Sequence, residues 1–458
     1  MSESDCSDTA SDNRVDGFEC DWVVENPTMY RPGGFHPVAI GDELHDGRYR
    51  VIHRLSHGAY GTVWMALDQR PVSTAGTRIR YVAVKIGTAS YNTTEATIIR
   101  QLHNRPMSEL FCSLNLADRE TQQDVRGLII TVLDEFDIHG PNGTHHCLVT
   151  ELLGPSVSAV RDRTDIGGWG VLPPSIARPV AVQCAEAVVL LHSQGIVHAD
   201  LHTGNMLFAL TVDIHEWSVE EVYAALGHPR EIPMHEALQN GWDIMAPHDP
   251  VSAHQPQCLV YPPAVSRLWA LCCSSPPTIR IIDFTESFPE PWAAAAAAEN
   301  RHLPGTPRSV AAPELLLNLS TKVTKAIDVW ALGCVIFELV SQGHPFRRGP
   351  GPLADYLASI MLGLGGENNV PEAFREAFRA SGAMRAAKNP WRDDRDWNEK
   401  FAELREITEN PLSKEDEQLL CKVIASAFVI EPGDRASAAE ILALLRQAWP
   451  EMFNRRTA

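Results

Sequence analysis

The sequence predicts an α+β fold, in which a small, mostly antiparallel sheet with one main helix precedes a larger, mainly helical part. Within residues 49–150, short apolar segments rich in β-branched residues are separated by Gly, Pro and Asn turn signals, as strands are. One segment there, 93–103, instead has the apolar spacing of a helix. Beyond Gly154, segments 177–195 and 327–343 have helical patterns, and the second is apolar nearly all round, as a buried central helix is.

Composition divides the chain into five regions. The first 27 residues hold eight acidic side chains against one Arg, which is typical of a disordered tail. Residues 211–278 contain nine Pro and five His and show little periodicity apart from a possible helix at SVEEVYAAL. We therefore expect this insert to be partly loop or disordered. The predicted regions are an acidic tail 1–27, an N-terminal extension 28–48, a sheet part 49–153, a helical part 154–210 with 279–450, and an insert 211–278.

The charge and cysteine content exclude several function classes. The 458 residues carry 58 Asp and Glu against 39 Lys and Arg, a net charge of −19. This charge disfavours duplex DNA or an anionic membrane as a partner and would attract a basic protein, although the plainer interpretation is an acidic, soluble protein. The ten Cys contain no C-x-x-C pair, which predicts reduced thiols rather than a zinc site or secreted disulfides. The longest apolar stretch is about twelve residues, shorter than the roughly 20 that span a bilayer.

Two motifs in the sheet part suit phosphate binding. LSHGAYGTV, from Leu55 to Val63, lies between predicted strands, and Gly58 and Gly61 would let its backbone turn tightly and point N–H groups at phosphate oxygens. Alone, this pattern also fits an ordinary glycine hairpin. VAVK follows and ends at Lys85, whose ammonium could reach phosphates if Glu95 on the next helix held it in place; an ordinary surface lysine is the alternative.

Two further motifs follow in the helical part. HADLHTGN contains Asp200, which can accept a hydroxyl proton, and Asn205, which can bind Mg²⁺, while His198 is expected to pack beneath the loop. IIDF places Asp283 at the end of an apolar strand, where its carboxylate could bridge Mg²⁺ to phosphates. An isolated Asp after a strand is usually a turn or cap residue. The ordered set of Lys, Glu, Asp, Asn and Asp predicts phosphoryl transfer.

Two supporting signals leave alternatives open. AAPE supplies Glu314 and a downstream EPGDR supplies Arg435, which would form either a buried pair or a weak surface ion pair. Asp328, at the start of the apolar helix, could accept backbone N–H groups of the HADLHTGN loop or simply be an N-terminal helix carboxylate.

Over roughly residues 49–450 these motifs resemble eukaryotic protein kinases, and specifically the SR-protein kinases of the CMGC group, especially fungal members. The most specific likeness lies in residues 33–64 and 140–157 and in the HADLHTGN loop, and the insert 211–278 resembles the spacer of these kinases. The resemblance implies a bilobal protein-kinase-like fold, with a small antiparallel sheet lobe carrying one main helix and a larger, mainly helical lobe. It also implies ATP, Mg²⁺ and phosphorylation of Ser in Arg/Ser-rich splicing factors.

Residue roles follow from the same resemblance. Lys85 and Glu95 would form the lobe-bridging ion pair, Asp200 would be the catalytic base, and Asn205 and Asp283 would hold Mg²⁺. Thr150 would be the gatekeeper of the adenine pocket, with hinge contacts from its neighbours. The implied nucleotide-binding set is Leu55, Gly58, Gly61, Val63, Ala83, Lys85, Thr150, Glu151, Leu153 and Leu207. A buried stack linking the lobes would comprise Ile99, His198 and Phe284.

The chain departs from the family pattern at five positions. Ala199 replaces an Arg that would grip a phosphorylated activation loop, which argues against regulation by that route. His202 replaces a Lys and removes a fixed positive charge near the γ-phosphate, which would slow transfer. Ser56 and Thr285 replace glycines, and Ala311 replaces an Arg.

Two other functions compete with a protein kinase. HADLHTGN and IIDF also resemble aminoglycoside and choline phosphotransferases, which act on small hydroxylated molecules but generally lack AAPE, DVWALGC and a counterpart of Arg435. The departures would also suit a pseudokinase, a nucleotide-binding scaffold without activity. For the kinase, we expect basic Arg/Ser-rich protein substrates steered by an acidic groove, a monomer in cytoplasm and nucleus, and no direct nucleic-acid or membrane partner.

Overall fold

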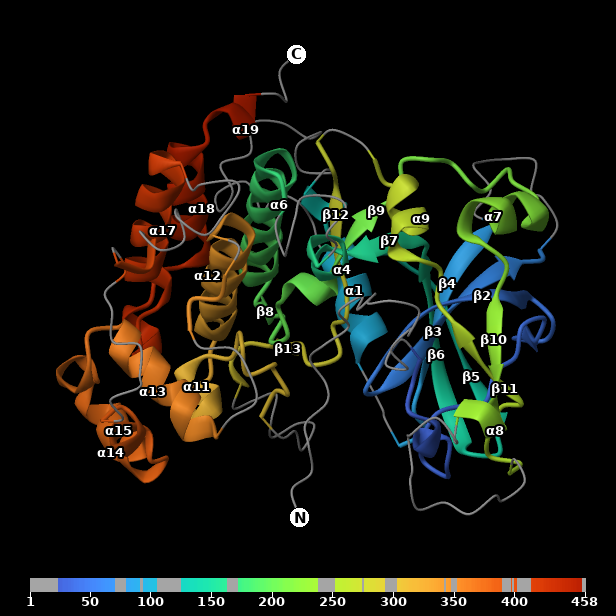
Figure 1. Cartoon of the computed structure of the whole chain (residues 1–458), viewed down its shortest axis with the longest axis horizontal. Coiled ribbons are helices and arrows are strands. Elements are labelled where there is room, and N and C mark those ends of the chain that lie inside the picture. The colour runs from blue at the N-terminus through green and yellow to red at the C-terminus, as the bar shows by residue number, and fades with distance from the viewer. Residues whose placement is uncertain are drawn as a thin grey trace. The chain divides into compact units, whose positions relative to one another are not determined.

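The computed structural model describes residues 24–70, 80–90, 94–104, 125–162, 172–237, 252–273, 276–292, 303–341, 343–346, 352–388, 397, 399–401 and 413–454. The chain forms two compact units (Figure 1). The first unit comprises residues 1–100, 130–162 and 207–274, and the second comprises 101–129, 163–206 and 275–458. Strands dominate the first unit and helices the second, so the α+β prediction is confirmed.

A six-stranded antiparallel sheet forms the framework of the first unit, in the order β1-β2-β3-β4-β6-β5. Its strands are β1 (Glu43–Leu44), β2 (Tyr49–Gly58), β3 (Gly61–Asp68), β4 (Tyr81–Gly87), β5 (Val132–Gly140) and β6 (Gly143–Glu151). Helix α1 (Glu95–Asn104) follows β4, as predicted. The expected hairpin of β5 and β6 turns at PNGT. β5 begins at Val132, later than expected, because Ile129 forms an isolated parallel bridge with Ile281 instead.

Both faces of this sheet are buried. On β3, Trp64 and Ala66 join one apolar cluster, whereas Met65 and Leu67 join another. Successive side chains of a strand point to opposite faces, so these clusters lie on the two faces of the sheet. This explains why β3 reads as an almost continuous apolar run rather than as alternating residues.

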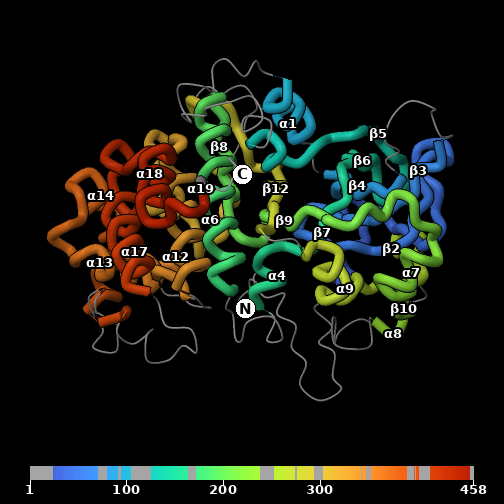
Figure 2. The backbone as a smooth tube through the Cα atoms, turned by 90° about the horizontal axis from the view of Figure 1, so that it is seen from above, coloured from blue at the N-terminus to red at the C-terminus, as the bar shows by residue number. Residues whose placement is uncertain are grey.

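The insert is more ordered than expected. Its described residues form α7 (Val219–Leu226), β10 (Arg230–Pro233), α8 (Met234–Ala237), β11 (Cys258–Tyr261) and α9 (Val265–Ala270). The predicted helix at SVEEVYAAL is confirmed as α7, which begins with a capping box between Ser218 and Glu221. β10 and β11 pair antiparallel, and Val260 of β11 joins the Trp64 cluster. The insert therefore packs on the first unit's sheet (Figures 1 and 2).

The N-terminal segment also packs on this unit. The sequence placed residues 1–27 in a disordered tail, but Val24 and Glu25 are buried, so this boundary is wrong for residues 24–27. Val24, Tyr30 and Phe35 join a cluster with Met234 and Leu259 of the insert. The apolar side chains here outweigh the local acidity that suggested disorder. Residues 1–23 lie outside the described part of the chain.

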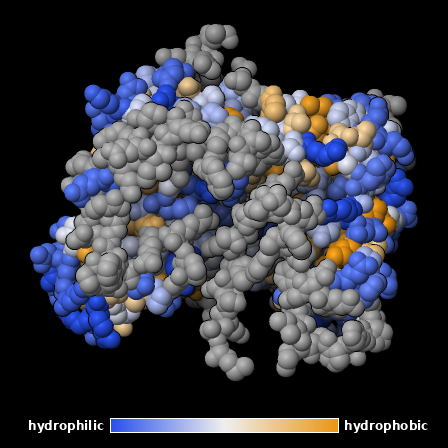
Figure 3. Space-filling model, viewed as in Figure 1, coloured by the Kyte–Doolittle hydropathy of each residue, from blue (hydrophilic) through white to orange (hydrophobic). Residues whose placement is uncertain are grey.

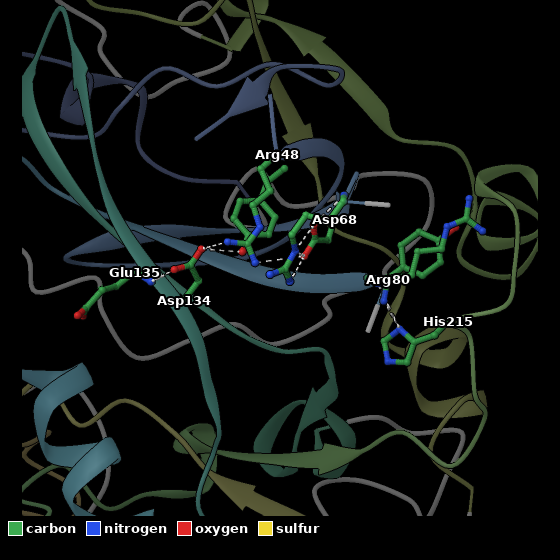
Figure 4. Close-up of polar contacts among 9 residues, drawn as sticks. Arg48, Asp68, Arg80, Asp134, Glu135 and His215 are labelled. Atoms are coloured by element: carbon green, nitrogen blue, oxygen red, sulfur yellow. Dashed lines mark hydrogen bonds and ion pairs between the residues drawn. The ribbon is translucent and has the colours of Figure 1, made fainter. Parts of the chain in front are cut away.

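Three polar contacts join segments at the beginnings of β2 and β4 to their neighbours (Figure 4). Arg48, before β2, donates hydrogen bonds to Asp134 of β5 and Asp68 of β3. His215 of the insert accepts the backbone N–H of Arg80 through Nδ1 at 3.2 Å. The insert is therefore anchored where β4 begins.

Helices that were expected from the sequence form the core of the second unit. α6 (Pro174–Ser193), α12 (Ala326–Ser341), α17 (Lys414–Ala427) and α18 (Ala438–Ala448) pack against one another. α6 is long and apolar enough to cross a membrane, but it is mostly buried, as the core helix of a soluble protein is. The first unit also contains, wholly or largely, α4 (Val157–Arg161), β7 (Leu153–Ser156) and β9 (Met206–Ala209). The second unit also contains β8 (Ile196–Val197), η4 (Thr203–Asn205), β12 (Ile279–Ile281), β13 (Phe288–Pro289), α11 (Pro313–Leu316), α13 (Leu353–Gly363), α14 (Glu372–Ala380), α15 (Ala383–Ala386) and α19 (Glu451–Asn454).

The surface shown in Figure 3 is largely hydrophilic where it is described, with hydrophobic residues in small groups. Among the described residues, the exposed large hydrophobic side chains are Tyr60 and Val212. Tyr60 lies at the tip of the β2–β3 hairpin.

Candidate active site

The glycine motif forms the β2–β3 hairpin, in which Gly58 pairs with Gly61. A side chain at Gly61 would place its Cβ 2.7 Å from the carbonyl oxygen of Ile86, so this position has room only for glycine. A side chain at Gly58 would meet nothing within 4 Å. Gly61 therefore allows close packing on β4, whereas the described residues leave room for a side chain at Gly58.

Lys85 and Glu95 form the ion pair that the sequence predicted. The Lys85 Nζ lies 2.9 Å from Glu95 Oε2. The Glu95 side chain is 4% exposed and that of Lys85 is 26% exposed. A buried carboxylate without its cation is costly, so the pair fixes the ammonium at the end of β4.

The predicted nucleotide-binding residues all belong to the first unit. Cross-strand partners are Val63 with Lys85, and Ala83 with Thr150. Directly opposed residues in an antiparallel sheet share a face, and Ala83 and Lys85 are two residues apart on one strand. These four side chains therefore lie on one sheet face.

The remaining members of the predicted nucleotide-binding set lie on neighbouring strands of the first unit. Leu55 and Val63 pack against the same apolar cluster as Met65. Leu153 on β7 pairs with Ala209 on β9, the strand that carries Leu207. Glu151 ends β6; its side chain accepts the Thr131 N–H at 3.0 Å, and its backbone carbonyl accepts the Thr150 hydroxyl at 3.2 Å.

Asp200 is held by Asn205 from the end of the HADLHTGN loop. The Asn205 amide donates to Asp200 Oδ2 at 2.8 Å and to the Asp200 carbonyl at 2.9 Å. The other carboxylate oxygen, Oδ1, is buried and has no hydrogen-bond donor among the described residues. His202 Nε2 lies 3.7 Å from Asp200 Oδ2, and its Nδ1 accepts the Gly204 N–H. Asp200 thus has one fixed oxygen and one oxygen able to accept a proton.

Buried Asp328 holds the loop from below. Its two oxygens accept the backbone N–H groups of His198 and Ala199, each at 2.8 Å, and His192 lies 3.0 Å from Oδ2. Ala199 has φ +67°, a left-handed conformation that non-glycine residues adopt only with outside support. Asp328 supplies that support, so the interpretation of Asp328 as a loop anchor is confirmed.

Asp283 lies beside Asn205. The backbone N–H of Ile282 donates to the Asn205 carbonyl at 3.0 Å, and Asp283 has φ +61°. Thr285, which replaces a family glycine, donates its hydroxyl to Asp283 Oδ1. His198 is buried and contacts Phe284, with ring centroids 4.9 Å apart, as expected for the packed residues beneath the loop.

Glu314 and Arg435 form the buried pair, not the surface one. Both side chains are 0% exposed, with bonds of 2.8 and 3.1 Å. Arg435 also donates to the carbonyls of Ala326 and Val429. Through Arg435, the AAPE segment is therefore joined to the start of α12 and to the EPGDR segment.

Sequence reasoning missed hydroxyl contacts to the same loop. Ser287 donates to the His198 carbonyl at 2.9 Å, and Thr306 donates to the Ala199 carbonyl. Glu286 accepts the Gly305 N–H at 3.0 Å. The contacts of Ser287, Thr306 and Glu286 hold the segment after Asp283 without an Arg at position 199. Ser and Thr in loops are too common for their sequence alone to have indicated this.

No family model matches the chain. Protein kinase dsk1 of Schizosaccharomyces pombe is 33% identical over 190 residues, which cover 41% of this chain and 31% of that protein. SRSF protein kinase 3 of Homo sapiens is 29% identical over 187 residues, or 41% and 30% of the two chains. Serine/threonine-protein kinase SKY1 of Saccharomyces cerevisiae is 30% identical over 184 residues, or 40% and 22%. Over about two fifths of its length, the chain is similar to SR-protein kinases. Its match spans about a third or less of the length of these curated relatives.

Each unit carries its own part of the expected site. The first unit holds Lys85, Glu95 and the nucleotide-binding set, and the second brings Asp200, Asn205 and Asp283 together on adjoining backbone. Their joint action on one nucleotide stays a prediction.

Proposed function

We propose that the chain is an ATP-dependent serine/threonine protein kinase that phosphorylates Ser in Arg/Ser-rich proteins. The observation that carries this proposal is the state of Asp200, whose Oδ2 is fixed by Asn205 while its buried Oδ1 lacks a donor. A serine hydroxyl can supply that donor. The relatives support the proposal, since their names are those of protein kinases and one is named for SRSF substrates.

The nucleotide would be held by the first unit. Lys85, fixed by Glu95, offers an ammonium to the α- and β-phosphates, and the hairpin of Gly58 and Gly61 would offer backbone N–H groups to phosphate oxygens. The apolar face around Ala83 and Thr150 suits an adenine ring.

The residues present fit Mg²⁺. Asn205 donates to Asp200 through Nδ2, which leaves its side-chain amide oxygen as a ligand. Asp283 adds a carboxylate nearby. Mg²⁺ prefers such oxygen ligands and commonly takes only one or two from the protein. Bound there, the ion would neutralise phosphate charge.

Asp200 would then orient the substrate hydroxyl and receive its proton on Oδ1. His202, close to Asp200, takes the place of the family lysine and offers positive charge only when protonated. We therefore expect slower transfer than a lysine would allow.

The predicted lobes, 49–153 and 154–210 with 279–450, and the spacer 211–278 belong to this proposal. The packing of the insert on the sheet supports a spacer that serves the nucleotide-binding part. The net charge of −19 supports a basic substrate. A monomeric state and a location in cytoplasm and nucleus stay predictions.

The test is phosphate transfer from labelled ATP to an Arg-Ser repeat peptide, with Asp200→Asn as the control. Transfer to this peptide, and its loss in the control, is expected. Nucleotide binding without transfer to any basic protein would indicate a scaffold instead. Transfer only to small hydroxylated compounds would indicate the other class of phosphotransferase.

A further inference from the structure

A buried ion pair joins the N-terminal segment to strand β2. Arg54 donates to Glu25 through both terminal nitrogens, at 2.9 and 2.8 Å, and both side chains are 1% exposed. The Tyr30 hydroxyl donates to the same carboxylate. Burial alone would raise the pKa of Glu25, but Arg54 and Tyr30 outweigh burial and lower it, so Glu25 is an anion at neutral pH.

Arg54 makes a third hydrogen bond that leads into the glycine hairpin. Its Nε donates to the carbonyl oxygen of Ser56 at 2.8 Å, and its guanidinium lies over the Trp64 ring, 4.5 Å from the centroid. The β2–β3 register shifts between Arg54 and Ser56, which marks a local irregularity where the strand enters the hairpin. Ser56 begins the exposed stretch of the hairpin that ends at Tyr60.

These contacts restrain the guanidinium on three sides. The planar group presents donors in a fixed geometry, so Glu25 sets its orientation and, with it, the direction of the bond to Ser56. Without Glu25, Arg54 would be a buried cation with no counter-charge, and solvation would favour its withdrawal. The Ser56 carbonyl would then lose the donor that holds it.

We propose that Glu25 is a positioning residue for phosphoryl transfer, because it fixes the glycine hairpin through Arg54 and Ser56. The inference rests on the proposed function, in which this hairpin covers the nucleotide phosphates. In this proposal, the N-terminal segment around Glu25 contributes to nucleotide binding without any of its residues contacting the nucleotide.

Two substitutions separate positioning from folding. Arg54→Lys retains a cation for Glu25 but cannot also donate to Ser56 in the same geometry. Glu25→Gln retains the size of the side chain and removes its charge. The matched control is Glu43→Gln, at an exposed carboxylate on β1. Each variant is measured for its Kd for a non-hydrolysable ATP analogue with Mg²⁺, its KM for ATP, its KM for the Arg-Ser peptide, and its Tm.

We expect Arg54→Lys and Glu25→Gln to raise the nucleotide Kd and the KM for ATP by about tenfold, within the range that small misplacements cause. The KM for the peptide and all values of Glu43→Gln should stay at wild-type levels. If Glu25→Gln fails to fold, Glu25→Asp replaces it: the shorter carboxylate keeps the charge but cannot meet both terminal nitrogens of Arg54 in the same geometry, so nucleotide binding should again be weaker.

Wild-type nucleotide affinity in Arg54→Lys or in Glu25→Gln would overturn the positioning role and leave the proposed function intact. Equal losses of nucleotide affinity and peptide affinity, in step with Tm, would also overturn it, because a general loss of folding explains them. Failure of the wild-type chain to bind nucleotide would overturn the proposed function itself.

Discussion

Thr285 donates a hydrogen bond from its hydroxyl to Asp283 Oδ1, the carboxylate proposed to bind Mg²⁺. A glycine at this position, which the family resemblance would imply, could not make this contact. Hydrogen bonds to a metal-binding carboxylate orient it, and their loss typically costs about 10–100-fold in metal affinity.

We therefore predict that Thr285→Val weakens metal binding about tenfold, whereas Thr285→Ser retains it. The measurement is an electron paramagnetic resonance titration with Mn²⁺ in the presence of a non-hydrolysable ATP analogue. Equal Mn²⁺ affinity in the Val variant and the wild type would show that the hydroxyl is unimportant for the carboxylate.

Asp200→Asn should lower kcat by about 10²–10⁴-fold, because the amide cannot accept the hydroxyl proton. The amide oxygen can still accept the hydrogen bond from Asn205, so the KM for ATP and the Tm should change little. Steady-state kinetics and thermal unfolding check this. A variant with near-normal kcat would remove Asp200 from the chemistry.

Asp328→Ala should destabilise the second unit by about 3 kcal/mol, since it leaves the backbone N–H groups of His198 and Ala199 buried without acceptors. Ala199 would also lose the support for its left-handed backbone. Urea unfolding followed by tryptophan fluorescence measures the change. A shift no larger than that of an exposed substitution such as Glu376→Ala would contradict the anchoring role.

His36 gives a prediction for pH. Burial, together with neighbouring His145, lowers the pKa of His36 from 6.5 to about 4. The folded state therefore binds fewer protons than the unfolded state between these values, and stability that is present above pH 6.5 is lost as the pH falls toward 4. In His36→Gln, the urea midpoint should fall less steeply over this interval. Identical slopes for the variant and the wild type would contradict the assignment.

The sequence could predict those contacts that family motifs place at fixed spacing. The sequence predicts the contact of Lys85 with Glu95, and it offers those of Asp328 with the HADLHTGN loop and of Glu314 with Arg435 beside plainer alternatives, because each pair lies in a motif with a known role. Glu25 with Arg54 could not be found in this way. The two residues are separated by 29 positions, and Glu25 ends an acidic run that local composition assigns to solvent.

The insert shows the same limit. Its Pro and His content suggested loop structure, and only the capping residues of α7 gave a helical signal. Strands β10 and β11 form because the insert packs against residues distant in the sequence; for example, Met234 and Leu259 pack against Tyr30. Local sequence patterns do not encode such contacts.

The burial of Val260 limits how far the insert could be shortened in evolution. Because this side chain fills the same cluster as Trp64 and Val84, excision of the insert would strip apolar cover from strands at the heart of the sheet. A chain that lacks the insert but keeps every predicted catalytic motif is expected to aggregate unless new side chains cover this cluster. Selection can therefore lengthen or vary the loops within the insert more freely than it can discard the insert.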